Sequence, residues 1–235
     1  MKELAEGVWS LGSTKGGHVR AFLLDDGHEL TLVDTLFEPD GRGVLEGLRS
    51  IGRRAADLRH IIITHGHRSH LGGAAALKRA SGATVHTHEW EADIVTGDRR
   101  AQSVTLLPRQ SLRLLPFQIG LRLNRPRHEP CPVDQAVGED DEIGPLRVMH
   151  APGHSPGHLA FHWPERRFLI AGDSISTWPD FRAGWDAFNL NPRKHRETIA
   201  RLAGLDADVV GVGHGDPIAG GAAERVRELA ERPAA

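Results

Sequence analysis

The chain has 235 residues, of which 39% are hydrophobic, enough to form the core of one large domain or two small ones. Its net charge of −2 argues against a nucleic-acid-binding protein, and its single cysteine, Cys131, excludes a disulfide framework within the chain. No run of about 18 apolar residues predicts a membrane-spanning helix, and no secretory signal pattern follows Met1, so we expect a cytoplasmic protein.

The first part of the chain is predicted to begin with antiparallel strands and then to alternate strands with helices. Asp26-Gly27 predicts a two-residue hairpin turn, because this pair tolerates positive φ values. Asp40 precedes an apolar stripe of helical period and is the expected N-cap of that helix. The predicted elements are strands at residues 8–10, 19–24, 30–33, 61–64 and 84–87, and helices at 41–51, 74–80 and 89–96.

Three histidines follow one of these strands within six residues. An isoleucine run ending at Thr64 predicts a buried strand, and His65, His67 and His70 come directly after it. A loop can turn His65 and His67 toward one point, and His70, near the start of the next helix, can approach from another side. Neutral imidazole is the commonest protein ligand for zinc, so the loop predicts a metal site. The alternative is a polar loop whose histidines bind nothing.

Residues from about 97 to 132 break the alternation of strands and helices. Leucines such as Leu106 and Leu121 are interleaved with arginines such as Arg109, and four prolines argue against a long helix. Two interpretations stay open: a lid-like insertion that covers a site, or a surface excursion whose leucines pack on the body. Contact with a membrane surface ranks below both, because the prolines interrupt any amphipathic face.

The second part of the chain repeats the order of strands followed by strand–helix alternation. Asn191 followed by Pro192 predicts a helix start, and Gly204 predicts its end. The predicted strands are at residues 135–137, 146–150, 159–163, 168–171 and 208–212, and the predicted helices at 192–203 and 221–231. We therefore expect an α/β protein in which residues 1–235 form one domain built from two similar halves.

Four further polar features fall at the ends of predicted strands. They are Asp34, the turn at residues 151–158 that contains His154, Asp173, and His214. Glycine beside most of them permits tight turns and close backbone approach. Residues of these types on loops at strand ends are typical of a site held by a rigid sheet.

The segments Thr64-His-Gly-His-Arg-Ser-His70, Pro152-Gly-His154, Gly172-Asp173 and Gly213-His214 together resemble the metallo-β-lactamase fold hydrolases, including their glyoxalase II-like branch. The resemblance covers nearly the whole chain in the right order. It implies a four-layer αββα sandwich with metals at one edge of the two sheets. It also implies that His65, His67 and His154 hold a first metal, that Asp173 bridges, and that His70 and His214 hold a second. We expect Asp34 to orient the loops or a ligand histidine.

The sequence departs from the family pattern at one position. The family's loop reads His-x-His-x-Asp-His, and Ser69 stands at the aspartate position. In relatives with two metals that carboxylate ligates the second ion and orients the attacking water. Serine is a far weaker ligand, so we predict a firm first site and a weakened second one. Ser69 and Asp173 are the expected catalytic residues.

The predicted reaction is hydrolysis of a small-molecule substrate. Bound zinc lowers the pKa of its water toward about 7 and polarises a carbonyl oxygen, and three ligands with an open position form a catalytic zinc site. Hydroxide would then attack an ester-like carbonyl. Because Ser69 replaces a candidate proton carrier for the leaving group, esters, thioesters and lactones are favoured over unstrained amides, and a main role in β-lactam resistance is disfavoured.

Two other functions stay open. One is an iron-dependent oxygenase of the sulfur dioxygenase type, because a single iron can be held by two histidines and a carboxylate. The other is a metal-binding protein without catalysis. For the substrate, Arg68 could bind an anion, fill the space of the absent carboxylate or lie in solvent. Trp178 and Trp185, with Phe181 and Phe188, could wall an apolar pocket or simply pack.

Overall fold

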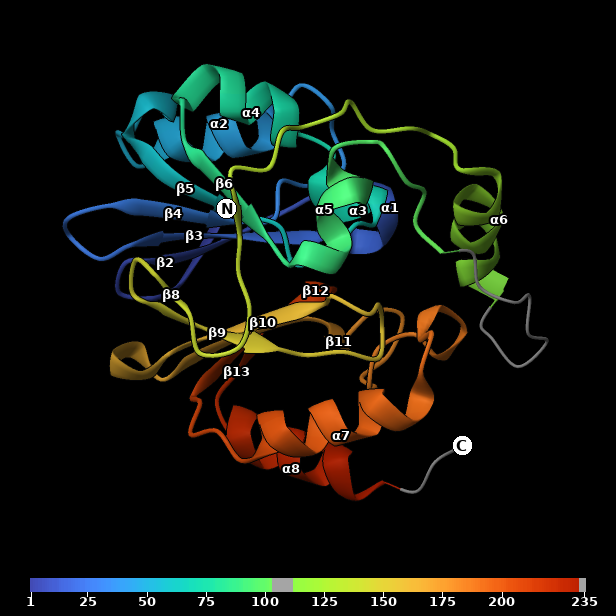
Figure 1. The fold of residues 1–235 in the computed structure, drawn as a ribbon. Coiled ribbons are helices and arrows are strands. Elements are labelled where there is room, and N and C mark those ends of the chain that lie inside the picture. Colours follow the sequence, from blue (N-terminus) through green and yellow to red (C-terminus); the bar gives the residue numbers. More distant parts are fainter. Residues whose placement is uncertain (103–111, 233–235) are drawn as a thin grey trace.

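The computed structural model describes residues 1–102 and 112–232 and has four layers, in the order helices, sheet, sheet, helices (Figure 1). The predicted αββα sandwich is thereby confirmed. The helices are α1 (Lys15–His18), α2 (Arg42–Ser50), α3 (Arg68–Leu71), α4 (Ala74–Ser81), α5 (Glu89–Val95), α6 (Leu115–Leu123), α7 (Pro192–Ala203) and α8 (Ala222–Glu231). Short 3-10 turns are η1 (Ala55–Asp57), η2 (Leu112–Leu114), η3 (Pro164–Arg166) and η4 (Asp186–Phe188).

The first sheet follows the chain order from β1 to β7. Its strands are β1 (Lys2–Ala5), β2 (Val8–Gly12), β3 (Arg20–Asp25), β4 (Leu30–Val33), β5 (Leu58–Ile62), β6 (Thr84–Thr87) and β7 (Gln135–Ala136). The pairs from β1 to β4 are antiparallel, and those from β4 to β7 are parallel. Because the carboxyl ends of parallel strands share one edge, the residues after β4 and after β5 meet there.

The second sheet has the order β13-β12-β11-β10-β9-β8. Its strands are β8 (Glu142–Ile143), β9 (Leu146–His150), β10 (Leu159–Trp163), β11 (Phe168–Ser176), β12 (Val209–His214) and β13 (Ile218–Ala219). Only β11 and β12 run parallel among these described strands. Their carboxyl ends carry Asp173 and His214, which brings two of the predicted ligands to the same end of this sheet.

Apolar side chains fill the space between the sheets and both outer spaces. In β3, Phe22 and Leu24 point into the core between the sheets, whereas Ala21 and Leu23 belong to the core under α2 and α4. The alternation of side chains along a strand therefore buries both faces of the sheet. The Phe22 ring lies 5.8 Å from that of Phe168 across the interface, which fixes the two sheets against each other.

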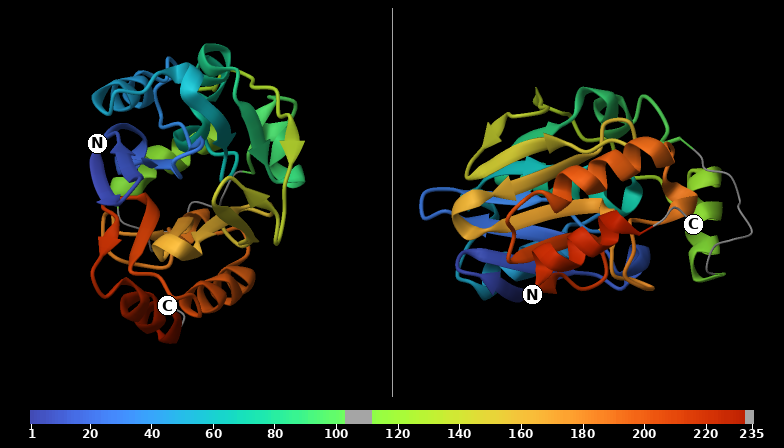
Figure 2. Two further views of the ribbon diagram at one scale, coloured as in Figure 1. Left: turned by 90° about the vertical axis from the view of Figure 1, so that its left-hand side faces the viewer. Right: turned by 90° about the horizontal axis from the view of Figure 1, so that it is seen from below.

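Helices cover the outer faces of the two sheets. α2 and α4 lie on the first sheet, and α7 and α8 lie side by side across the second (Figure 2). Asn191 caps α7 as predicted, since its Oδ1 accepts a hydrogen bond from the Lys194 amide at 3.0 Å and Pro192 occupies the first helical position. The third core cluster lies under α7 and α8 and includes Ile199 and Leu202.

Several local predictions need correction. Residues 26–29 form a four-residue connection between β3 and β4, closed by a bond from the Asp26 amide to the Glu29 carbonyl, rather than a two-residue turn. Gly41, in a left-handed conformation, precedes α2, so Asp40 is not the N-cap, although its carboxylate accepts the Arg42 amide. β11 continues to Ser176, so Asp173 lies within the strand and not after it.

The segment after residue 97 contains a helix that the sequence did not predict. α6 lies at one end of the sandwich, beyond the strand ends (Figure 1). Pro116 stands in its first turn, where no backbone donor is needed, and a left-handed Asn124 ends it. The prolines therefore permit this short helix, because Pro116 lies in its first turn and Pro126 lies beyond its end. Leu106 and Arg109 lie outside the described residues. No helix in the described chain is long and apolar enough to span a membrane.

Candidate metal centre

The histidine loop is held in place by Asp34 at the end of β4. Asp34 accepts hydrogen bonds from the Thr64 amide and from the Thr64 hydroxyl, both at 2.9 Å. The hydroxyl of Thr64 in turn lies 3.0 Å from Nδ1 of His65. Since the hydroxyl proton is given to Asp34, Thr64 accepts the Nδ1 proton of His65. The Nε2 lone pair of His65 is therefore free to face the site.

His70 is oriented by the same carboxylate. Its Nδ1 lies 2.8 Å from Oδ2 of Asp34 and donates to it, since a carboxylate accepts only. The Thr35 amide also donates to the His70 carbonyl, so α3 is fixed at its backbone as well. Nε2 of His70 lies 3.2 Å from Oδ1 of Asp173 and 3.3 Å from Nε2 of His214.

Two histidines from the second half of the chain are oriented in the same way. Nδ1 of His154 lies 3.3 Å from Oδ1 of Asn189, and Nδ1 of His214 lies 2.8 Å from the Gly17 carbonyl. Their Nε2 atoms both lie 3.3 Å from Oδ2 of Asp173. The outer hydrogen bond of each ring thus sets the tautomer that turns a lone pair inward.

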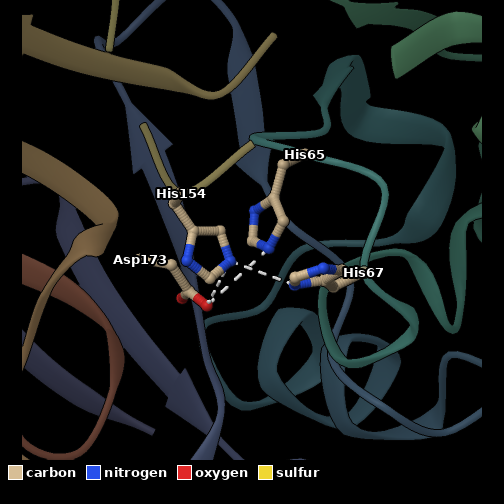
Figure 3. Close-up of side chains that lie close together, drawn as sticks. All are labelled: His65, His67, His154 and Asp173. Carbon is tan, nitrogen blue, oxygen red and sulfur yellow. Dashed lines mark hydrogen bonds and ion pairs between the residues drawn. The ribbon is translucent and has the colours of Figure 1, made fainter. Parts of the chain in front are cut away.

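These side chains form two adjoining groups that share Asp173. His65, His67, His154 and Asp173 offer ligand atoms that all lie within 4.8 Å of one another (Figure 3). His70, Asp173 and His214 form the second such group. The structure therefore brings together all six residues that the sequence singled out as metal ligands.

The donor set fits a cation. Nε2 of His65 and Oδ1 of Asp173 are buried and have no hydrogen-bond partner among the described residues. Nε2 of His154 and Nδ1 of His67 approach to 3.0 Å. The inward-facing atoms of the first group are mostly imidazole lone pairs and carboxylate oxygens, and a divalent ion is the complement that would satisfy them. Imidazole and carboxylate ligands suit zinc and iron alike.

Burial and neighbouring charges set the protonation of the cluster. Burial and adjacent histidines hold the pKa of His65 well below its usual range, and burial lowers the pKa of His67 to about 4. Burial alone would raise the pKa of Asp173, but His214, His70 and His154 outweigh it and hold it well below its usual range. The first group is thus a carboxylate with neutral imidazoles, the forms that bind a metal.

His70 differs from the other histidines. Burial by itself would lower its pKa, but the carboxylates of Asp173 and Asp34 outweigh burial and raise the pKa to about 10. Without a metal, the ring therefore holds a proton between the two carboxylates. A cation at its Nε2 has to replace that proton, which makes occupation of the second group dependent on pH.

Ser69 lies beside the cluster but belongs to neither group of ligand atoms. It is part of α3, lines the cavity in front of the histidines, and packs close to Gly16. Its hydroxyl has no hydrogen-bond partner in the part of the chain that the structure describes. Serine at this position therefore adds no carboxylate to the second group.

The two ligand groups border a cavity of about 620 Å³, which His67, Asp173 and His214 line. Residues from α6 and from the segments on either side of it line the cavity, including Pro116, Phe117 and Leu121. The described parts of the segment between residues 97 and 132 thus form part of the cavity wall. Movement of this segment as a lid stays a prediction.

The predicted substrate-binding residues take different positions. Arg68, Trp185 and Phe188 line the cavity, and the Trp185 ring stacks on His214 with 4.1 Å between ring centres. Trp178 does not line it. Its ring packs behind, against Trp185 and Phe117. Phe181 lies under Arg225 and Arg232, at α8, and does not line it either.

Glu91 is a buried residue of the site region that sequence reasoning missed. Its carboxylate accepts the Gly66 amide at 2.9 Å, the Ser155 hydroxyl at 2.7 Å and the Gly157 amide at 2.9 Å. These donors belong to the two loops that carry His65, His67 and His154. A signal was present in the sequence, since Glu91 shares the buried face of α5 with Ile94 and Val95.

His158 also supports the cluster from behind. Its Nε2 accepts the backbone amide of Asp173 at 3.0 Å, and burial lowers its pKa to about 3, so the ring is neutral. Gly172 has a φ of 53°, and a Cβ there would lie 2.7 Å from this ring. This bond and the glycine together place Asp173 within β11.

Comparisons with known proteins give a family and several relatives. The family profile described as Metallo-beta-lactamase superfamily matches residues 14–214. The chain is 28% identical over 242 residues to the probable metallo-hydrolase YflN of Bacillus subtilis, covering 93% of this chain and 87% of YflN. It is 27% identical over 179 residues to hydroxyacylglutathione hydrolase of Rhodobacter capsulatus, covering 74% of this chain and 55% of that enzyme.

The chain spans 40% to 59% of the length of the hydroxyacylglutathione hydrolases that it matches, and 62% of YobT of Bacillus subtilis. Among solved structures, the metallo-beta-lactamase family protein TTHA1429 from Thermus thermophilus superposes with a TM-score of 0.70 at 28% identity, covering 97% of this chain and 78% of that one. TTHA1623, solved in a di-iron-bound form, has a TM-score of 0.71 at 22% identity, covering 94% and 98%, and shows the shared fold.

Proposed function

The chain belongs to the metallo-β-lactamase superfamily, and we propose that it is a metal-dependent hydrolase that cleaves a small ester, thioester or lactone. The observation that carries the proposal is the pair of ligand groups that share Asp173 and border a cavity of small-molecule size. The similarity to a probable metallo-hydrolase and to hydroxyacylglutathione hydrolases supports the reaction class.

The ligand residues divide into a firm and a weaker set. His65, His67 and His154 would hold a first ion together with Asp173, and His70 and His214 would hold a second through the other side of that carboxylate. When bound, zinc lowers the pKa of water toward about 7 and polarises a carbonyl oxygen. Asp34 and Glu91 keep the ligand loops in position, and Ser69 leaves the second set one carboxylate short.

The chain's own groups limit the choice of substrate. Ser69 cannot carry a proton to a departing group as a carboxylic acid would, so the bond to be cleaved has to release a stable leaving group. Thiolates and strained or activated alcohols meet this condition, and the nitrogen of an unstrained amide does not. Phe117, Trp185 and Phe188 line the cavity and would exclude water around the reacting carbonyl.

A metal analysis combined with a hydrolysis panel tests the proposal. Protein prepared without added metal would be assayed for metal content and for turnover of thioesters, lactones and aryl esters, and compared with His154→Ala. We expect bound metal and turnover in the native chain and loss of both in the variant. Bound metal without turnover of any substrate would instead support a metal-binding protein without catalysis.

Iron chemistry is the second candidate, because the donor set of the first group also suits iron. Because Ser69 stands where the family pattern has a carboxylate, the site would hold a single ion. Histidines and Asp173 would bind that ion and leave coordination positions open to oxygen. Oxygen uptake with a persulfide substrate, measured beside the hydrolysis panel on the same preparation, separates the two functions. Uptake that depends on bound iron would replace the hydrolase proposal.

A further inference from the structure

The cavity in front of the two ligand groups is rich in positive charge. Five arginines line it, against two aspartates, although the chain as a whole carries a net charge of −2. One of the aspartates is Asp173, which belongs to the metal groups, and the other is Asp98. The arginines are Arg68, Arg99, Arg100, Arg125 and Arg127.

The arginines differ in how their charge is compensated. Arg99 forms a two-point ion pair with Asp93, at 2.6 and 2.8 Å, so its charge is neutralised within the protein. Arg100, Arg125 and Arg127 are exposed, and their side chains form no ion pair with any described residue. They are therefore available to a ligand in the cavity.

Arg68 is the most firmly placed of the five. Its guanidinium donates to the carbonyls of Phe37 and Arg127 and lies 4.7 Å from the centre of the Phe37 ring. Both hydrogen-bond partners are neutral carbonyls. The nearby Glu38 carboxylate attracts the guanidinium but forms no ion pair with it in the described structure, so Arg68 keeps charge for a ligand. Arg68 also follows His67 directly in the chain, which sets its distance from the metal groups. The bond to the Arg127 carbonyl brings the segment of Arg125 and Arg127 to the same wall.

We propose that the substrate carries a carboxylate or phosphate group remote from the scissile carbonyl, and that Arg68, Arg125 and Arg127 bind it. The inference rests on the proposed hydrolase function and narrows its substrate class to anionic esters or thioesters. Guanidinium groups pair with carboxylates and phosphates through two parallel hydrogen bonds. Apolar walls such as Phe37 and Phe117 exclude water and strengthen this attraction.

A matched pair of thioesters tests the proposal. Propionyl thioesters of N-acetylcysteamine, which is neutral, and of 3-mercaptopropanoate, which is anionic, present the same acyl group. We expect the native protein to favour the anionic one by roughly tenfold or more in kcat/KM, through KM, because a charge-assisted pair is worth about that much. The preference should shrink as salt is added.

Arginine variants test whether these side chains cause the preference for the anionic thioester. The double variant Arg125→Gln with Arg127→Gln, and separately Arg68→Met, should bring the anionic-to-neutral ratio toward one. Arg59→Gln, at an exposed position of β5 outside the cavity, is the matched control and should leave the ratio unchanged. Equal kcat/KM values for both thioesters in the native protein, or variants that lower both in proportion, would overturn the proposal.

A binding measurement separates this proposal from the hydrolase proposal. The thioether 3-(propylthio)propanoate and its amide are not hydrolysed and can be titrated into the metal-loaded protein by calorimetry. We expect the carboxylate to bind roughly tenfold more tightly than the amide and the double variant to lose that difference. If no thioester is cleaved but this difference is present, the hydrolase proposal fails and the anion site stands. If the difference is absent or survives in the double variant, the anion site fails.

Discussion

Oδ2 of Asp34 lies 2.8 Å from Nδ1 of His70, and the same carboxylate accepts the amide and hydroxyl of Thr64. One buried residue at the end of β4 therefore orients His70 directly and His65 through Thr64. These two histidines belong to different ligand groups, so Asp34 links the geometry of both.

Replacing Asp34 with asparagine should weaken metal binding at both groups. The amide keeps the size of the side chain but cannot accept all three hydrogen bonds, so His65 and His70 lose their fixed tautomer. Changes to such supporting residues typically cost about 10- to 100-fold in metal affinity. Competition with a chromophoric chelator measures the loss. Asp180→Asn, at an exposed ion pair, is the control, and equal affinity in both variants would contradict the role given to Asp34.

Removing the Glu91 carboxylate should loosen the two ligand loops. Glu91→Ala leaves three buried donors of these loops without their acceptor, which should cost roughly 2–4 kcal/mol of unfolding free energy. Metal affinity should fall as well, because the histidines of both loops lose their relative placement. Urea unfolding and metal titration measure the two effects. Glu89→Ala, at an exposed position of the same helix, should change neither.

Replacing Ser69 with aspartate should strengthen the second metal group. The new carboxylate would supply an anionic ligand next to His70 and His214. We expect it to tighten the binding of a second ion at least tenfold, since even a change to a residue that only supports a metal ligand typically costs about 10- to 100-fold in metal affinity. Ser69→Asn, which has the same shape without charge, is the control. Second-ion affinity that stays the same in the aspartate variant would show that our account of this loop is wrong.

The metal-free protein should be most stable near neutral pH. His65, His67 and His154 have lowered pKa values in the folded state, so the unfolded chain binds more protons below about pH 6.5, and stability falls with falling pH by about 1.4 kcal/mol per pH unit for each such group. His70 acts in the opposite sense. Its pKa is raised to about 10, so its contribution is complete below about 6.5 and is lost as pH rises toward 10.

Urea midpoints of the chelated protein at pH 5, 6.5 and 8.5 check both arms of this profile. In His70→Gln the alkaline decline should be reduced and the acidic decline kept. A variant that still loses stability to the same extent between pH 6.5 and 8.5 would show that His70 is not protonated between the two carboxylates.

The sequence was sufficient to identify the fold and the cluster of polar residues, because both depend on local patterns. His65, His67 and His70 stand next to an apolar strand, and His154, Asp173 and His214 lie in or beside glycine-containing turns and strand ends. Such patterns can be read without knowing how the chain packs. The exact extent of β11 escaped prediction, since Gly172 there looks like a strand end but continues the strand beside β12.

Apart from Asp34, the supporting contacts were not predictable, because they join residues far apart in the chain. Asn189 at His154, Gly17 at His214 and Glu91 at the two loops each depend on the final packing. The same holds for the tryptophans. Trp178 and Trp185 are seven residues apart and equally aromatic, yet Trp185 lines the cavity and Trp178 packs behind it. No periodicity distinguishes them.

The metal content of the native protein tests the central claim most directly. Protein prepared without added metal and dialysed extensively would be analysed by mass spectrometry of its elements, beside His154→Ala. We predict one retained equivalent of a divalent transition metal in the native chain, a second that dialysis removes, and none retained in the variant. Two equivalents retained through dialysis would contradict the weakened second group, and no metal at any stage would contradict the metal centre itself.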